Sequence, residues 1–329
     1  MGRVSGFIWA CIAAALAAHA EAQTAPAGSA WPTRPIRLIV PTGAGTATDI
    51  MARLVANGIG AGLGQPVVIE NLPAASGLLA HQAAARATPD GYTLLFTATS
   101  GMSVNPISFK TLPYDPARDF VAVAMVCSLG PQMLSVNAGL PVKSVPELFA
   151  YARANRGRLS IGFDNTAGAA AFAAKLLNRR ADLGLVEVPY RATAQMTQDA
   201  ASGVVQVLMS SIAAARAMVD AGRLRRLAVT SPARFPALPD LPAVGEFAPG
   251  VAVNGWFAVM APAGTPAAVI ARVNREIGEF LKGPDIQQRL YTFGLATEGA
   301  GTPESTAAFI RADQERWRKL AQELGVRPQ

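Results

Sequence analysis

IRLIVPTGAGTATD, residues 36–49, is the stretch that decides the fold class. Its first five residues form a mostly apolar run with the length of a buried strand. A loop of glycine, alanine and threonine follows, and Asp49 is suited to cap a helix that we expect to end near Leu63. A strand that leads through a glycine loop into a helix is a repeating unit of α/β folds.

The same alternation of strand and helix patterns continues along the chain. Strand patterns occupy residues 67–71, 92–98, 159–163, 186–190, 205–209, 224–230 and 257–261, and two more lie within 121–138, separated by Gly130-Pro131. Helix patterns occupy residues 78–87, 144–156, 168–180, 192–202 and 212–221, and two long amphipathic helices close the chain at 266–282 and 303–324. The alternation predicts an α/β fold with largely parallel sheets, arranged as two lobes.

The composition is that of a globular protein with a sizeable core. The chain has 329 residues, of which 51% are hydrophobic and 16% are charged, and its length suggests about two domains. The formal net charge is +7, but the basic residues are scattered, which indicates solvated helix faces and not a nucleic-acid site. Outside the first 22 residues Cys127 is the only cysteine, and we expect it to be a buried apolar residue.

The first 22 residues have the pattern of a secretory signal peptide. Arg3 supplies the positive start, and the apolar stretch at 7–18 is too short to span a bilayer comfortably. Small residues at Ala20 and Ala22 fit a cleavage site, and we expect cleavage after Ala22. The sequence therefore predicts an exported, soluble mature protein, which disfavours a nucleic-acid partner.

Three loops place small and hydroxyl-bearing residues between a strand and a helix. They occupy residues 41–49, 97–103 and 164–169. Glycine lets the backbone approach a ligand closely, and the N–H groups at the start of a helix attract anions. Together the loops predict one cleft that holds an oxyanion through backbone N–H groups and hydroxyls. For the first loop, a simple turn capped by Asp49 remains an alternative, and a nucleotide fingerprint is absent because the loop has neither G-x-G-x-x-G nor a P-loop lysine.

The sequence does not indicate an enzyme. His81 is the single histidine outside the first 22 residues, and no G-x-S-x-G nucleophile motif lies near it. No His, Cys, Asp or Glu cluster has the spacing of metal ligands. We therefore expect no catalytic residue, no metal and no cofactor.

A series of short motifs, in one order, carries a resemblance to a known family. The motifs are WPTRPIRLIVP (31–41), LGQPVVIEN (63–71), PDGYTLL (89–95), LPYDP (112–116), DF (119–120), VPY (188–190), LRRLAVTS (224–231), ALPDLP (237–242) and APAGTP (261–266). From about residue 31 to 325 the chain resembles the extracytoplasmic solute receptors of tripartite tricarboxylate transporters, called the Bug or TctC family.

The resemblance implies a type II periplasmic-binding-protein fold, in which two α/β lobes close on a ligand in a hinged cleft. The implied domains are a signal peptide at 1–22, lobe 1 at 23–125 plus 249–329, and lobe 2 at 126–248. The implied function is that of a periplasmic, monomeric receptor that captures a small carboxylate, either a di- or tricarboxylate or an aromatic acid, and delivers it to membrane permease subunits. A receptor that passes the ligand signal to a membrane kinase remains the alternative.

The resemblance also assigns ligand-binding positions in the three loops and the facing lobe. Carried over to this sequence, they are Thr42, Gly43, Ala44, Gly45, Thr46, Ala47, Thr48, Asp49, Thr99, Ser100, Asn105, Asp164, Asn165, Thr166, Ala167, Gly168, Ala169, Tyr190 and Ser210.

Four positions depart from the family pattern, and all four departures remove size or charge. Thr42 stands where the family usually has an aromatic residue, Ala44 stands for a proline, and alanines follow Gly168 where a histidine is frequent. Ser210 stands for an aspartate that would suit a ligand ammonium, so amino acids are disfavoured as ligands. These departures predict a roomier, more apolar cleft and a carboxylate with a larger apolar body, such as an aromatic acid.

Overall fold

The computed structural model describes residues 31–164, 168–326 and 328, so the expected signal peptide lies outside the described residues. Strands and helices alternate in the order that the sequence predicts. The elements up to residue 137 are β1 (Ile36–Val40), α2 (Ala47–Leu63), β2 (Val67–Asn71), η1 (Ala74–Gly77), α3 (Leu78–Ala85), β3 (Thr93–Ala98), η2 (Ser100–Val104), α4 (Asn105–Ser108) and β4 (Phe120–Asn137). The later elements are α5 (Val145–Ala154), β5 (Ser160–Asp164), α6 (Ala169–Arg180), β6 (Val186–Tyr190), α7 (Thr193–Ser202), β7 (Val207–Ser211), α8 (Ile212–Asp220), β8 (Leu224–Val229), η3 (Val244–Glu246), β9 (Asn254–Pro262), α9 (Ala267–Leu281), α10 (Pro284–Thr292) and α11 (Pro303–Leu324).

The strands of the described part join one curled sheet, in the order β2-β1-β3-β9-β4-β7-β5-β6, with β8 paired to β4. β1 is parallel to β2 and β3, and β5 is parallel to β6 and β7. β4 and β9 are antiparallel to each other and to their other neighbours. The prediction of largely parallel sheets is therefore right for the two outer groups of strands. It is wrong for the centre, where the chain crosses from one group to the other.

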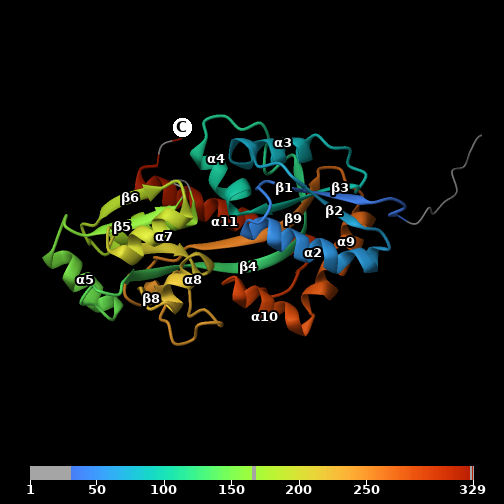
Figure 1. Ribbon diagram of the computed structural model, residues 1–329. Coiled ribbons are helices and arrows are strands. Elements are labelled where there is room, and N and C mark those ends of the chain that lie inside the picture. Colours follow the sequence, from blue (N-terminus) through green and yellow to red (C-terminus); the bar gives the residue numbers. More distant parts are fainter. Residues whose placement is uncertain (1–30, 165–167, 327, 329) are drawn as a thin grey trace, which may run out of the picture.

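β4 is continuous through Gly130 and Pro131, so the predicted break between two strands is wrong. Its register against β9 shifts at three places between Ala122 and Gly130, and such irregularities bend a strand without ending it. From Gln132 onward β4 pairs with β7 and β8. Figure 1 shows β4 and β9 running side by side through the middle of the molecule and linking its two halves.

Each half of the sheet has its own hydrophobic core. We call the β2-β1-β3 group with its part of β9 and β4 the first half, and the β7-β5-β6 group with β8 and the end of β4 the second half. The first half packs against α2, α3 and α9, and the second packs against α5, α6, α7 and α8. α11 joins both cores, because Ile310 packs in the first and Trp317 and Leu320 pack in the second.

The helix ends follow local capping rules. Thr46, and not the predicted Asp49, is the N-cap of α2, because its hydroxyl accepts a hydrogen bond from the Asp49 amide at 3.3 Å. Ser144 caps α5 as predicted. The sequence analysis missed the short α10, although Pro284 at its start is a typical first helical residue. No helix of the described part has the length and apolar character needed to cross a membrane.

Candidate functional site

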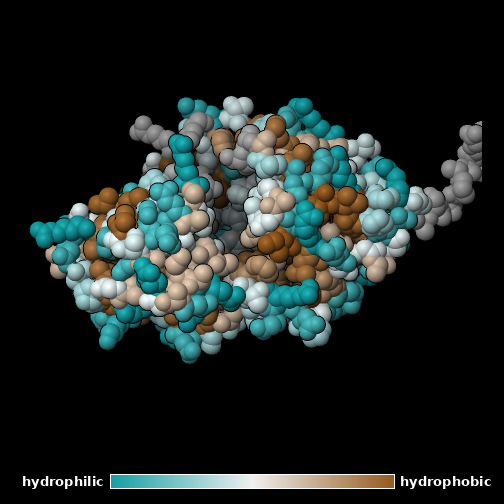
Figure 2. All heavy atoms as spheres, in the orientation of Figure 1, coloured by the Kyte–Doolittle hydropathy of each residue, from teal (hydrophilic) through white to brown (hydrophobic). Residues whose placement is uncertain are grey.

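A cavity of about 250 Å³ lies between the two halves of the sheet. Figure 2 shows the surface hollowed at the middle of the molecule, where the two halves face each other. The first half, the second half and the segment after α10 all contribute to its wall. The lining residues are Ala47, Thr48, Ala98, Thr99, Ser100, Val104, Gly130, Pro131, Gln132, Gly168, Ala169, Ser211, Ile212, Ala213, Gly255, Trp256, Phe257, Phe293, Gly294 and Leu295.

Three helices begin at this cavity. The first residues of α2, α6 and α8 are Ala47, Ala169 and Ile212, and all three line the wall. The first N–H groups of a helix have no carbonyl partner within it and carry the positive end of the helix dipole. The three helix starts, which come from both halves of the sheet, therefore make the cavity suitable for an anionic group.

The rest of the lining is uncharged and largely apolar. Among the described lining residues there is no Asp, Glu, Lys, Arg or His. Apolar side chains such as Val104, Ile212, Phe257, Phe293 and Leu295 form much of the wall. An anionic ligand with an apolar body matches this combination of amide donors and apolar surface.

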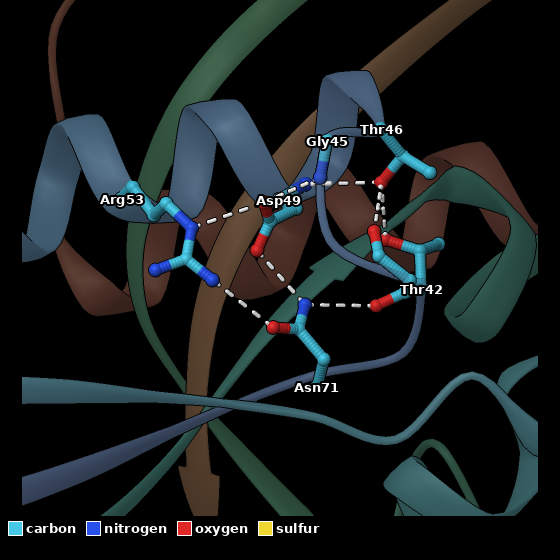
Figure 3. A network of polar contacts seen from close by, with 7 residues as sticks. Thr42, Gly45, Thr46, Asp49, Arg53 and Asn71 are labelled. Carbon is cyan, nitrogen blue, oxygen red and sulfur yellow. Dashed lines mark hydrogen bonds and ion pairs between the residues drawn. The ribbon is translucent and has the colours of Figure 1, made fainter.

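The loop before α2 is held by a network around Asp49 (Figure 3). The carboxylate of Asp49 accepts hydrogen bonds from the Gly45 amide at 2.8 Å, from Asn71 Nδ2 at 2.8 Å and from Arg53 Nε at 3.0 Å. Asn71 Nδ2 also donates to the Thr42 carbonyl at 2.9 Å, which ties the loop to the end of β2. Burial alone would raise the pKa of Asp49, but the hydrogen bonds and the charge of Arg53 outweigh it and hold the pKa at about 2. Asp49 thus stays ionised and positions the loop.

A second buried network supports η2, the turn that carries Ser100 and Val104 into the cavity wall. His81 is 2% exposed, and its ring lies between the Gly77 carbonyl, 2.7 Å from Nδ1, and the Thr97 hydroxyl, 2.9 Å from Nε2. The ring stacks on Tyr114, with the centroids 4.8 Å apart, and the Tyr114 hydroxyl donates to the Gly101 carbonyl at 2.6 Å.

Contacts from distant elements complete the support of η2. The Trp256 amide donates to the Thr99 hydroxyl at 2.9 Å, and Gln314 of α11 donates to the Met102 carbonyl at 2.9 Å. This segment of the cavity wall is therefore fixed by α3, β9 and α11 together.

The buried position of His81 predicts a pH dependence of stability. Burial lowers the pKa of His81 to about 4, against the smaller opposite effect of its hydrogen bond to the Gly77 carbonyl. The unfolded chain, with a histidine pKa of about 6.5, binds the proton more tightly, so acid favours unfolding. We expect the free energy of unfolding to fall by about 2 kcal/mol between pH 8 and pH 5.

Urea denaturation of the chain and of His81→Gln at a series of pH values measures this effect. His81 is the one histidine outside residues 1–22, so the variant is expected to lose most of the slope in this range. An equal slope in His81→Gln would assign the pH dependence to other groups.

The cavity brings together six of the positions that the resemblance assigned: Ala47, Thr48, Thr99, Ser100, Gly168 and Ala169. The remaining first-loop positions, Thr42, Gly43, Ala44, Gly45, Thr46 and Asp49, precede α2 or support it from behind and do not line the cavity. Asp164 ends β5, whereas Asn165, Thr166 and Ala167 lie outside the described residues.

Three further assigned residues have partners within the protein. Asn105 is buried, and its amide donates to the Tyr114 hydroxyl at 3.2 Å. The Tyr190 hydroxyl donates to Asp199 at 2.9 Å. Ser210 is fully buried, and its hydroxyl donates to the Ser211 carbonyl at 3.2 Å. The neighbouring Ser211, and not Ser210, lines the cavity.

Several lining residues were missed by the sequence analysis. They are Gly130, Pro131 and Gln132 of β4, Gly255, Trp256 and Phe257 of β9, the start of α8, and Phe293, Gly294 and Leu295 after α10. Ser211 before the apolar start of α8 has the pattern of an N-cap and could have been found. The others come from crossing strands and a loop, which have no local signal for a ligand site.

Comparison with known proteins finds a matching family and several similar chains. Residues 51–326 match the tripartite tricarboxylate transporter family receptor. The chain is 36% identical over 312 residues to a UPF0065 protein of Bordetella bronchiseptica, covering 94% of this chain and 89% of that protein.

Two solved structures of similar proteins contain carboxylates. A protein of R. palustris solved with adipate is 33% identical, with a TM-score of 0.80, over 91% of this chain and 100% of that chain. MatC from Rhodopseudomonas palustris, solved with bound malate, is 28% identical, with a TM-score of 0.73, over 88% of this chain and 99% of that chain. Both ligands are dicarboxylates.

Proposed function

Since the chain belongs to the tripartite tricarboxylate transporter receptor family, whose members are solute receptors and not enzymes, we propose that it captures a small carboxylate by lobe closure and delivers it to a tripartite tricarboxylate-type permease. The observation that carries this proposal is the convergence of three helix N-termini, those of α2, α6 and α8, on one uncharged cavity. Backbone N–H groups there can replace the water around a carboxylate.

The size and lining of the cavity support a ligand with an apolar body. A volume of about 250 Å³ equals that of about eight liquid waters, which suits a molecule of roughly that many non-hydrogen atoms or slightly more. Phe257, Phe293, Ile212 and Leu295 offer apolar surface and no charge. We therefore propose aromatic acids and medium-chain dicarboxylates in preference to amino acids. The adipate found in the similar R. palustris protein has this character.

The continuous crossing strands supply a mechanism for closure. β4 and β9 pass between the two halves of the sheet, and bending at their irregular register near Gly130 would move one half against the other. We propose lobe 1 at residues 23–125 plus 249–329 and lobe 2 at 126–248. α11 contacts both cores, so it would limit the extent of this movement.

The proposal places the mature protein in the periplasm, as a monomer released from a 1–22 signal peptide. Closure around the ligand would exclude water and strengthen each hydrogen bond to the carboxylate, because a low dielectric makes them worth more. The closed form would then be the state that the permease subunits bind.

Thermal unfolding of the mature chain with a panel of acids tests the proposal. The panel consists of benzoate, phenylacetate, adipate, succinate, malate, citrate and glutamate. At a hundredfold excess over its Kd, a ligand of the folded state adds about 2.7 kcal/mol of stability, which would raise the Tm by about 4 °C. We expect the largest shift with an acid that has an apolar body. A larger shift with glutamate would overturn the ligand class, and no shift with any acid would overturn the receptor function.

A further inference from the structure

Gln132 carries the only side-chain amide among the described residues that line the cavity between the two halves. It follows Pro131, the last β4 residue that pairs with β9, and in the sheet register it lies directly opposite Ser211 of β7. Ser211 is the N-cap of α8, one of the three helices that begin at the cavity. Residues opposite each other on neighbouring strands point to the same face, with their Cβ atoms about 5 Å apart. The side chain of Gln132 therefore lies beside the start of α8.

The backbone of Gln132 is held in place by Thr230. Its N–H donates to the Thr230 hydroxyl at 2.8 Å, and its carbonyl accepts a hydrogen bond from the Thr230 amide at 2.9 Å. The Thr230 hydroxyl in turn donates to the Val253 carbonyl at 2.6 Å. The half-buried side chain of Gln132, by contrast, forms no hydrogen bond with any residue within 31–164, 168–326 or 328. A fixed backbone thus presents a free amide to the cavity.

Other polar side chains of the wall already have partners within the protein. The Thr99 hydroxyl accepts a hydrogen bond from the Trp256 amide at 2.9 Å, and the Trp256 indole donates to Asp313 at 2.7 Å. The Ser211 hydroxyl accepts a hydrogen bond from the Ala214 amide at 3.3 Å. Among the described lining residues, Gln132 therefore has the longest polar side chain that is free to bind a ligand.

We propose that Gln132 binds a hydroxyl group on the body of the carboxylate ligand and so determines which acid is preferred. The inference rests on the proposed function and narrows it to hydroxylated acids. The amide has an oxygen that accepts hydrogen bonds and an NH2 group that donates them, and a hydroxyl both donates and accepts. The body of the ligand passes a described wall without charged side chains, where a neutral polar group matches an uncharged amide.

The same amide disfavours acids whose body is wholly apolar. Solvent can satisfy the amide of Gln132 only while the cleft is open. Closure around an apolar body would remove that solvent and leave a donor and an acceptor without partners, which costs free energy. Sites that hydrogen-bond a hydroxyl of their ligand reject the analogue without it for this reason. We therefore expect the hydroxylated acid to be selected over its unsubstituted parent.

Calorimetric titration of the mature chain with two matched series tests this role. One series is benzoate with its ortho-, meta- and para-hydroxy isomers, and the other is hexanoate with its α- and ω-hydroxy derivatives. Adipate is the reference acid without a hydroxyl. We expect one hydroxylated acid to bind about tenfold more tightly than its parent, because it gains a hydrogen bond to Gln132 that the parent lacks. The fixed backbone of Gln132 favours one position of the hydroxyl over the others.

Gln132→Met removes the amide and keeps a side chain of similar length. We expect this variant to bind the hydroxylated acid and its parent within about twofold of each other, with the affinity for the parent unchanged or slightly higher. Retained binding of the parent acid shows that the variant is folded and its cavity intact. Gln322→Met is the matched control, because Gln322 is exposed on α11 and lies outside the cavity wall. It is expected to keep the wild-type preference.

The possible failures are distinguishable. A preference for the hydroxylated acid that survives in Gln132→Met, or equal weakening of parent and hydroxylated acid in this variant, would overturn the role of Gln132. Binding of adipate without a preference for any hydroxylated acid would also overturn it and leave the proposed function intact. Failure of every acid, adipate included, to bind the wild-type protein would instead overturn the proposed function itself.

Discussion

Gly101→Val is expected to lower the free energy of unfolding by about 4 kcal/mol and to abolish ligand binding. Gly101 is buried in η2, and a Cβ atom there would lie 2.0 Å from His81 Nε2 and 2.9 Å from the Thr97 hydroxyl. The added side chain must displace the imidazole, which breaks its hydrogen bond to Thr97 and leaves buried polar groups without partners. Because Ser100 is the adjoining residue of the cavity wall, the same displacement distorts the ligand site.

Urea denaturation and ligand-induced thermal shift measure the two effects. Gly60→Val is the control, because the nearest atom to an added Cβ at Gly60 is 3.5 Å away, an ordinary contact. It is expected to change stability little. A double-mutant cycle isolates the cause: Gly101→Ala is expected to cost less in a His81→Ala background than in the wild-type protein. Additive costs would show that the clash with the imidazole is not the reason.

The strand–loop–helix pattern predicts those residues of the cavity wall that lie close together in the sequence. Ala47, Ala169 and Ser100 each lie where a strand ends and the chain turns into the next element, and glycine and hydroxyl-bearing residues mark these places in the sequence. Helix propensity and capping rules then suffice to predict that N–H groups are exposed there. The corresponding parts of the fold, the parallel strand groups and their helices, are predictable for the same reason.

The parts that sequence reasoning missed depend on contacts between distant segments. Pro131 and Gly255 lie in one wall because β4 and β9 cross, and Phe293 arrives by a loop after a short helix. The capping position of α2 was misplaced by three residues because both Thr46 and Asp49 are good N-cap residues. The role of His81 as a buried support for η2 is set by Tyr114 and Thr97, which are 33 and 16 residues away in the chain.

In the proposed receptor, ligand selectivity and ligand affinity have separate origins in the cavity wall. The donors proposed for a carboxylate are backbone N–H groups, which any residue except proline supplies, so a change of side chain that leaves the helix start intact retains them. The apolar wall consists of particular side chains, among them Ile212 and Phe293, and those determine which ligand body fits. We therefore expect a change that blocks the N–H groups to abolish binding of every acid, whatever the size and shape of its apolar part.

Ala169→Asp makes such a change and is expected to weaken binding of all carboxylates at least a hundredfold. Ala169 is the first residue of α6 and lines the cavity, so a carboxylate there competes for the N–H groups and repels the ligand. Two like charges at about 4 Å repel by about 4 kcal/mol at an effective dielectric of 20, more than the 2.7 kcal/mol of a hundredfold loss. The fold is expected to be unharmed or slightly stabilised, by about 0.5 kcal/mol, because an acidic residue favours a helix N-terminus.

Two variants separate the blocked site from other effects of the substitution. Ala169→Asn has nearly the same size without the charge and is expected to retain much of the affinity. Ala267→Asp introduces the same charge at the exposed first residue of α9, outside the cavity, and is expected to bind as the wild-type protein does. Calorimetric titration compares the three. Loss of binding in Ala267→Asp would show that the effect comes from net charge. Full binding by Ala169→Asp would show that the N-terminus of α6 does not bind the carboxylate. Loss in Ala169→Asp alone, with stability maintained, would locate the bound carboxylate at the start of α6.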